Sequence, residues 1–206
     1  MTGSHGHLSS PKNADLTRVR RPGTRIIADT GRLLLVRPSR ADAGVVRAFL
    51  LENRGFFEPW EPLRGDDYFG RSAVRQRLAQ TARDTRSGSA LAALIVAKGT
   101  GELLGDLSLS AIVRGPFQSC YLGYKLGRRH TGRGYMTEAL AAFVRVAFGS
   151  LKLHRIEANI MPANEASARV AVRAGFTREG ASARYLKING RWEDHDHYAI
   201  LNGDLE

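Results

Sequence analysis

Apolar residues recur along the chain with two different spacings, which separate the expected strands from the expected helices. A compact apolar run at 33–36 predicts a short buried strand, and Pro38 ends it. Ser39 can cap the helix that follows, with Asp42 three residues later in the capping-box position. Apolar residues between about 66 and 86 lie on one side of a helical repeat and predict a second helix.

The second half of the chain continues this alternation of strands and helices. Strands are expected at 91–97, 103–113, 120–126 and 154–160, and a final hairpin over 185–201 turns at Asn189 and Gly190. A one-sided apolar stripe predicts a helix over 135–148, and Asn164 caps another that runs to Ala174. The order predicts a mixed α/β (α+β) sheet in one domain, over residues 29–206.

Residues 1–28 differ from the rest in composition. They are rich in glycine, serine, proline and basic residues, and they show no apolar period. We therefore expect a basic, flexible tail ahead of the folded domain.

Charge and cysteine content limit the possible partners and compartments. Thirty-one Lys and Arg against 20 Asp and Glu give a formal charge of +11. Such a charge attracts polyanions, either a phosphorylated cofactor or RNA, although a basic composition can also be without a partner. With Cys120 as its single cysteine, the chain cannot form an internal disulfide. No apolar run approaches the ~20 residues of a membrane helix, so we expect a cytoplasmic protein without membrane contact.

A glycine-containing basic loop at 127–134 joins an expected strand to an expected helix. Free amides and the helix dipole at such a junction bind phosphate, and Gly132 and Gly134 let the backbone come close to it. The spacing from Gly127 to Gly132 matches the start of a P-loop. However, Arg133 and Gly134 follow, where that motif needs lysine and a hydroxyl residue, so nucleotide hydrolysis is disfavoured.

Two motifs in order resemble the Gcn5-related N-acetyltransferase (GNAT) family. Arg129-x-x-Gly132-x-Gly134 resembles the signature that binds the pyrophosphate of CoA. Downstream, Asn164-Glu165-Ala166-Ser167 followed by Gly175-Phe176 resembles a second element of the same family. The resemblance implies acetyl-CoA as the acetyl donor and requires no metal.

Further segments resemble one branch of this family, the RimJ-type ribosomal-protein-alanine N-acetyltransferases. They include Pro59-Trp60-Glu61-Pro62, Tyr121-Leu122-Gly123-Tyr124, His154-Arg155-Ile156 and Met161-Pro162-Ala163-Asn164. This resemblance implies a seven-stranded, mixed, mainly antiparallel sheet with splayed central strands and about four helices. It also implies an acceptor that is the N-terminal amine, alanine above all, of a ribosomal protein. The protein could be modified within the ribosomal subunit, where RNA contact is possible.

The resemblance assigns roles to individual residues. The cofactor-binding set comprises Tyr124, Leu126, Gly127, Arg128, Arg129, Thr131, Gly132, Arg133, Gly134, Tyr135 and Asn164. Backbone amides near Tyr124 to Leu126 would hold the thioester oxygen. Ser167, with Asn164 nearby, would protonate the leaving thiolate; helix capping is the alternative role for both.

The general base departs from the family pattern. Many relatives carry a glutamate at the position of Tyr121, which we keep as a candidate catalytic residue. Glu58, Glu61 and Glu157 could act as bases through water. At cellular pH roughly a fifth to a third of an N-terminal amine is neutral, against about 0.1% of a lysine. A missing carboxylate therefore favours an α-amine acceptor.

The aromatic and acidic segment 56–62 is expected to be a loop that forms one wall of the acceptor groove. Glu58, Trp60 and Glu61 are its candidate substrate-binding residues, and either carboxylate could face the incoming ammonium. The alternative is that the aromatic residues pack into the core while both glutamates face water.

Two other functions compete with this interpretation. The first is acetylation of a small amine such as an antibiotic, and the second is a ribosome- or RNA-binding role without catalysis. A metal site at 194–197 is disfavoured, because on a strand His195 and His197 share one face and the two aspartates share the other. Cys120 has no evident partner base and is expected in the core.

Overall fold

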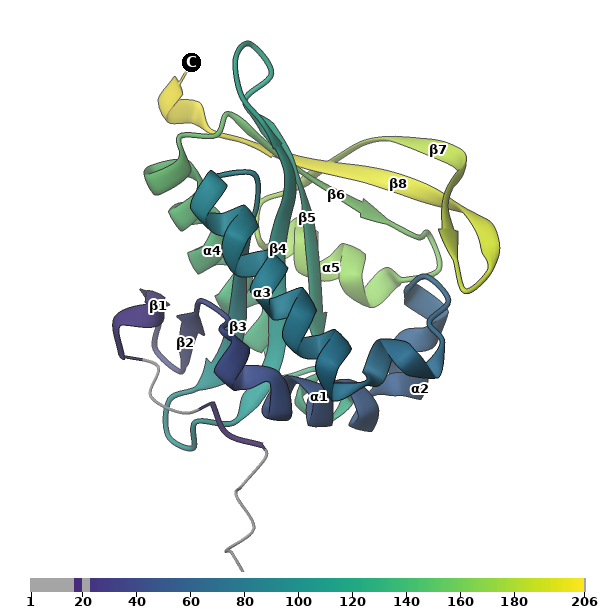
Figure 1. Cartoon of the computed structure of the whole chain (residues 1–206). Coiled ribbons are helices and arrows are strands. Elements are labelled where there is room, and N and C mark those ends of the chain that lie inside the picture. The colour runs from purple at the N-terminus through teal and green to yellow at the C-terminus, as the bar shows by residue number, and fades with distance from the viewer. Residues whose placement is uncertain (1–16, 20–22, 206) are drawn as a thin grey trace, which may run out of the picture.

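A sheet of eight strands runs through the centre of the protein (Figure 1). The structure is a computed structural model that describes residues 17–19 and 23–205. Its strand order is β1-β2-β3-β4-β5-β6-β8-β7. The strands are β1 (Ile26–Asp29), β2 (Leu33–Val36), β3 (Leu91–Ala97), β4 (Leu103–Val113), β5 (Ser119–Leu126), β6 (Arg155–Ile160), β7 (Thr177–Ile188) and β8 (Arg191–Leu201). The predicted mixed, mainly antiparallel sheet is confirmed, with eight strands in place of seven.

The additional strand, β1, lies in the segment that was expected to be a tail. It pairs antiparallel with β2, whose outer edge would otherwise present unpaired backbone groups. Further upstream, Val19 is buried, and its amide donates to the carbonyl of Gly101 at 2.9 Å. The predicted boundary at residue 28 is therefore wrong, because apolar residues before it complete the sheet. Residues 1–16, most of the expected tail, lie outside the described residues.

The central strands β5 and β6 separate after a short parallel pairing. Only Ser119 to Tyr121 of β5 pair with β6, opposite Arg155 to Glu157. Beyond that point β5 continues along β4 while β6 continues along β8, and Figure 1 shows the two strands diverging. The splayed strands that the resemblance implied are thus present, and they open a gap between β5 and β6 in the middle of the sheet.

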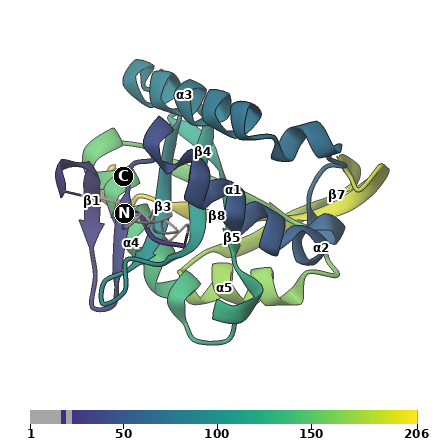
Figure 2. The ribbon, with the colours of Figure 1, turned by 60° about the horizontal axis from the view of Figure 1, so that its bottom comes forward.

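Helices cover both faces of the sheet and leave a buried core on each side (Figure 2). The helices are α1 (Ala43–Glu52), α2 (Arg54–Phe57), α3 (Arg71–Ser87), α4 (Tyr135–Leu151) and α5 (Glu165–Arg173). On one face α1 and α3 pack on Val36, Leu94 and Val96. On the other face α4 and α5 pack on Leu33, Leu35 and neighbouring strand residues. No helix in the described ranges is long and apolar enough to cross a bilayer.

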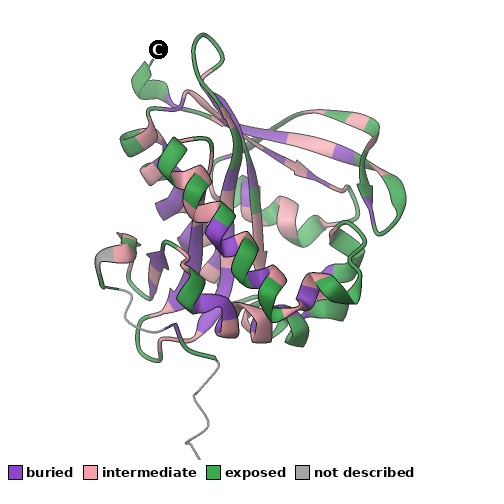
Figure 3. Cartoon of the chain, viewed as in Figure 1, coloured by how far each residue is buried: buried purple, intermediate pink, exposed green. Residues whose placement is uncertain are grey.

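Two elements differ from their predicted extents. The segment expected to be a loop over 56–62 begins as helix α2 and continues as a 3-10 turn at Glu58–Trp60. Phe57 is buried there against Phe49, so packing on α1 stabilises a turn of helix that local sequence does not indicate. Strand β7 begins at Thr177 rather than near residue 185, because it pairs with β8 along nearly its whole length. Most residues of β7, which forms one edge of the sheet, are exposed (Figure 3).

Candidate active site

The gap between β5 and β6 is occupied by a cavity of about 440 Å³. Leu122 to Leu126 of β5 line one side, and Ala158 to Ile160 of β6 line the other. The N-terminus of α4, the face of α5 and the turn after α2 complete the walls. The cavity therefore forms where the sheet loses its pairing, and it exposes backbone that a continuous sheet would use.

The backbone of β5 presents hydrogen-bonding groups to this cavity. Gly127 donates its amide to the carbonyl of Leu104 at 2.8 Å, which fixes the alternation of the β4–β5 ladder. In an antiparallel pair, every second residue turns its amide and carbonyl away from the partner strand. At this register those residues are Tyr124 and Leu126, whose amides are directed toward the gap. This geometry fits the oxyanion-binding role expected for the segment.

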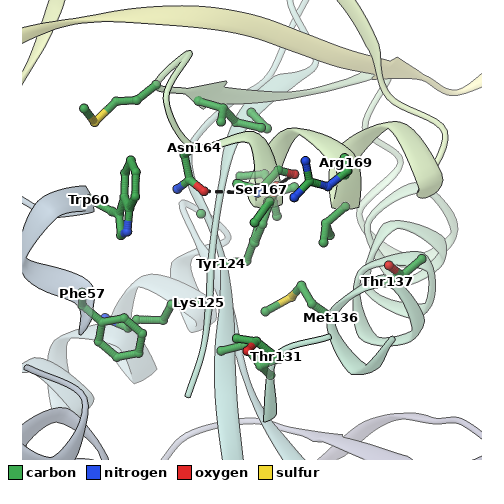
Figure 4. A pocket seen from close by; sticks show the side chains of 18 of the residues that line it. Phe57, Trp60, Tyr124, Lys125, Thr131, Met136, Thr137, Asn164, Ser167 and Arg169 are labelled. Carbon is green, nitrogen blue, oxygen red and sulfur yellow. Dashed lines mark hydrogen bonds between the residues drawn. The ribbon is translucent and has the colours of Figure 1, made fainter. Parts of the chain in front are cut away.

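Tyr124, Ser167 and Asn164 form a connected group on the cavity wall (Figure 4). Ser167 Oγ donates to the Tyr124 hydroxyl at 2.8 Å, and that hydroxyl donates to the Ser167 carbonyl at 3.0 Å. The Ser167 amide donates to Asn164 Oδ1 at 3.2 Å. The predicted capping role of Asn164 is confirmed, and Ser167 also faces the cavity. The sequence assigned Tyr124 to cofactor binding and did not indicate its bond to Ser167.

Burial makes the Tyr124 hydroxyl harder to deprotonate. Removal of the phenol from water raises the pKa of Tyr124 to about 12, although the hydrogen bond with Ser167 opposes this shift. The hydroxyl therefore keeps its proton at neutral pH. A protonated phenol inside the cavity can donate to an anion that forms beside it.

The start of α4 supplies free amides at the other end of the cavity. The first intrahelical bond runs from the Glu138 amide to the Gly134 carbonyl, so the amides of Tyr135, Met136 and Thr137 precede it. Gly132 and Gly134 both adopt positive φ, 73° and 74°, which places them in the left-handed region that glycine favours. This helix terminus combines unpaired donors with the positive end of the dipole, as an anion site requires.

The structure leaves fewer backbone amides free to bind phosphate than the sequence predicted. Gly127 bonds Leu104, and the amide of Arg128 donates to Asn53 Oδ1 at 2.8 Å. The amides of His130 and Thr131 close turns onto the carbonyls of Gly127 and Arg128. The prediction that Gly127 and Arg128 offer free amides is therefore wrong, since contacts distant in sequence already use them. The amides from Gly132 to Thr137, which lead into α4, have no hydrogen-bond partner among the described residues.

The three loop arginines also lie elsewhere than expected. Thr131, Gly132, Gly134 and Tyr135 line the cavity, whereas Arg128, Arg129 and Arg133 are absent from its wall. Arg129 pairs with Glu52 at 2.9 Å on the outer surface. In their place, Arg169 and Arg173 of α5 line the cavity. Their spacing of four residues in a capped helix puts them on one face, a signal that sequence could have provided.

An ion pair supports the loop from outside. Arg32 Nε lies 2.7 Å from Glu138 Oε2, and Nη1 of the same side chain donates a hydrogen bond to the carbonyl of Arg133 at 3.0 Å. The Arg32 guanidinium also stacks 4.5 Å above the centre of the Tyr135 ring. Burial alone would raise the pKa of Glu138, but hydrogen bonds from Thr30 and Arg32 outweigh it and lower that pKa. These contacts hold the glycine loop against β2.

The three residues predicted to bind the acceptor substrate do not all lie in the same cavity. Trp60 and Glu61 line the cavity, but Glu58 lines a smaller hollow on the other side of the turn. Glu61 Oε1 accepts a hydrogen bond from Lys125 Nζ at 2.8 Å, so an ion pair already uses its charge. Burial opposes the charge of Lys125, yet Asp106 and Glu61 more than compensate and raise the pKa of Lys125. Glu61 therefore anchors the turn after α2 to β5.

Two of the candidate catalytic residues, Tyr121 and the possible base Glu157, lie outside the cavity. Tyr121 is 41% exposed on β5 beside Glu157 of β6, and neither residue lines the cavity. Glu157 is bonded to Arg155 at 3.1 Å. Their neighbour Cys120 is buried in the core, as expected, and burial raises the pKa of its thiol to about 12. A thiol with that pKa is a poor nucleophile at neutral pH.

The histidine pair on β8 contributes a cavity residue that sequence analysis had set aside. His195 is buried and lines the cavity, while His197 bonds Asn159 of β6 and Ser182 of β7. On the opposite face, Asp196 accepts a hydrogen bond from Arg178 at 2.6 Å. Across residues 17–19 and 23–205, the structure shows no group of three or more histidine, cysteine or acidic residues able to hold a metal.

Comparison with known proteins gives consistent matches along the chain. Residues 32–177 match the family of acetyltransferase (GNAT) domains. The chain is 41% identical over 177 residues to the probable N-acetyltransferase YjcK of Bacillus subtilis, covering 85% of this chain and 98% of that protein. It is 36% identical to the [ribosomal protein uS5]-alanine N-acetyltransferase of Escherichia coli, covering 89% and 93%.

A solved structure agrees with these matches. RimJ of Mycobacterium smegmatis, determined in complex with CoA-disulfide, superposes with a TM-score of 0.79 at 31% identity. The superposition covers 84% of this chain and 83% of that one.

Proposed function

Since the chain belongs to the GNAT family of acetyltransferases, we propose that it transfers an acetyl group from acetyl-CoA to the N-terminal α-amine, alanine above all, of a ribosomal protein. The observation that carries the proposal is the cavity between β5 and β6. It brings a protonated phenol, a serine and two strand amides together beside the N-terminus of α4.

The residues at one end of the cavity fit a pyrophosphate. Free amides from Gly132 to Thr137 would bind its oxygens, and Arg169 and Arg173 would add positive charge across the cavity. The M. smegmatis relative was solved with a CoA-disulfide, and acetyl-CoA is the donor that the GNAT family uses. When bound, it supplies the activated thioester from which the acetyl group is transferred.

The chain's own residues act on the two charges that develop during transfer. The amides of Tyr124 and Leu126 would stabilise negative charge on the carbonyl oxygen. The Tyr124 hydroxyl would then give its proton to the departing thiolate and regain one from Ser167 Oγ, which is bonded to it. Asn164 holds the Ser167 amide and so fixes the start of α5 at this point.

Several features favour an α-amine over a lysine as the acceptor. The E. coli relative acts on the alanine of a ribosomal protein. In this chain the only acidic residue on the cavity wall, among those described, is Glu61, which is paired with Lys125. Without a free carboxylate, an amine that is already partly neutral reacts more readily. The charge of +11 would also favour acceptors presented on a ribosomal subunit in the cytoplasm.

Ser167→Ala is expected to lower kcat by about tenfold while the affinity for acetyl-CoA stays within about twofold. The hydroxyl acts in proton return to Tyr124, which occurs only as the thiolate leaves. Steady-state kinetics together with calorimetric titration of acetyl-CoA measure the two effects. Ser72→Ala, at an exposed position of α3, is a matched control. An unchanged kcat would show that the Ser167 hydroxyl takes no part in catalysis.

The function itself is tested by comparing acceptors of equal length. The enzyme is incubated with acetyl-CoA and either an alanine-starting peptide or an N-terminally blocked peptide that carries one lysine. Intact-mass comparison of ribosomal proteins from cells with and without the gene then identifies the acceptor. We expect one added acetyl group on the α-amine peptide and on one ribosomal protein. Preference for the lysine peptide, for small amines alone, or no transfer at all would contradict the proposal.

A further inference from the structure

His195 lines the cavity and has one ring nitrogen that no described residue hydrogen-bonds. The side chain is 3% exposed and lies on the cavity wall, and its Nδ1 is 3.0 Å from the carbonyl oxygen of Glu193. A carbonyl can only accept a hydrogen bond, so Nδ1 carries the proton of the neutral ring. The lone pair therefore belongs to Nε2, and the backbone contact fixes this tautomer.

Nε2 of His195 remains accessible within the cavity. It has no hydrogen-bond partner among the described residues. Among those residues, the one fully buried polar side-chain atom without a partner is Nη2 of Arg77, so Nε2 of His195 is not fully buried. Nε2 is thus unpaired and keeps some exposure to solvent. A buried imidazole with one anchored nitrogen and one accessible basic nitrogen is arranged to accept a proton.

The other titratable groups on the described cavity wall are unsuited to that task. Tyr124 holds its own proton, since burial raises the pKa of its hydroxyl to about 12. Lys125 stays cationic, because Asp106 and Glu61 raise its pKa despite burial. Glu61 is engaged by Lys125. Tyr135, Arg169 and Arg173 also line the cavity, and their phenol and guanidinium groups are hydrogen-bond donors.

The surroundings of His195 include groups of both charges. Tyr185 of β7 contacts it with ring centres 5.8 Å apart, and Ser182 is its partner in the β7–β8 register. On its own strand Glu193 and His197 share its face, while Asp194 and Asp196 point to the other side. Glu61 and Lys125, which are paired with each other, line the same cavity.

We infer that His195 is the general base of the reaction, an inference that rests on the proposed acetyl transfer. An ammonium acceptor loses one proton to His195 Nε2, directly or through one water, and the neutral nitrogen attacks the thioester carbon. The C–N bond forms and the C–S bond breaks. The thiolate takes a proton from Tyr124, and the second nitrogen proton replaces it through Ser167 and solvent. His195 returns its proton to solvent, so the products are an amide, free CoA and one released proton.

The inference is tested with His195→Ala and with His197→Ala as the matched control. His197 lies on the same strand and face, but protein groups bond both of its nitrogens. For His195→Ala we expect kcat near neutral pH to fall by about 100-fold or more. The acidic limb of its pH–rate profile should disappear, and added imidazole should restore part of the lost rate. His197→Ala should keep the acidic limb and gain nothing from imidazole.

Folding and substrate choice are checked separately. Circular dichroism melting and calorimetric titration of acetyl-CoA show whether His195→Ala remains folded, and His195→Gln provides a larger replacement if it does not. The kinetics use whichever amine the wild-type enzyme acetylates, so that a failure of the alanine peptide overturns the proposed acceptor alone. A folded variant that keeps its acidic limb, with kcat within about threefold of wild type, overturns the role of His195.

Discussion

Tyr124→Phe is expected to lower kcat by about 100-fold or more, while acetyl-CoA affinity stays within about twofold. Phenylalanine keeps the ring that packs at the edge of the core and removes only the hydroxyl. That hydroxyl is the group bonded to Ser167, and burial keeps it protonated by raising its pKa to about 12. Its proton is needed when the thiolate forms, a step that contributes to kcat rather than to binding.

Comparison with a second tyrosine sharpens this test. Tyr121 stands at the strand position where the family resemblance places a glutamate base in relatives, but it lies outside the cavity and is half-exposed. We expect Tyr121→Phe to change kcat by less than about threefold. Steady-state kinetics on both variants, with acetyl-CoA titrated calorimetrically, decide between the two positions. Equal losses in the two variants would show that the hydroxyl in the cavity has no special role.

The double variant Tyr124→Phe/Ser167→Ala tests whether the two hydroxyls act as one unit. If Ser167 works only through Tyr124, the double variant should be no slower than Tyr124→Phe alone, since residues of one proton path are non-additive. Multiplied losses would mean that each hydroxyl reaches the thiolate independently.

Local sequence signals predicted those parts of the structure that depend on local contacts. The capping box at Ser39 and Asp42 is present, and Asn164 caps α5 as its position indicated. The left-handed glycines before α4 follow from the same kind of signal. In each case the partner lies within a few residues, so the pattern itself contains the interaction.

Features that depend on distant contacts could not be predicted in this way. The amide of Arg128 is taken by Asn53, which is 75 residues away in sequence. Glu61 is neutralised by Lys125 across 64 residues. Neither pairing leaves a periodic or compositional trace, because each depends on how the splayed strand meets α1 and α2. His195 was set aside for a related reason, since the cavity that gives it a role forms only when β6 separates from β5.

Strand β1 is a further element that local sequence could not predict, because it depends on a contact with β2. Its first three residues are apolar, but the run is short and directly follows a basic segment, so sequence analysis assigned it to the tail. These residues form a strand because β2 leaves an open edge that pairs with them. The predicted end of the tail at residue 28 therefore falls inside a strand whose stability comes from its neighbour.

Gly132→Val is expected to weaken acetyl-CoA binding by about 100-fold or more, which corresponds to about 2.7 kcal/mol. A Cβ built on Gly132 meets nothing within 4 Å, so the added side chain would project into open space beside the free amides of the α4 start. A phosphate held by those amides needs the backbone at hydrogen-bond distance, and the branched side chain would keep it away. The substitution also places a β-branched residue at a φ of 73°, which costs stability on its own.

Gly88→Val separates these two effects. Gly88 ends α3 with a φ of 75°, and a Cβ there likewise meets nothing within 4 Å. The backbone penalty, on the order of 1–2 kcal/mol, should therefore be similar at both positions. Thermal melting should show comparable losses for the two variants, while calorimetric titration should show lost acetyl-CoA affinity for Gly132→Val alone. If both variants bind acetyl-CoA as the wild type does, the pyrophosphate does not lie against the glycine loop. If both bind it weakly, reduced stability rather than a blocked anion site accounts for the effect.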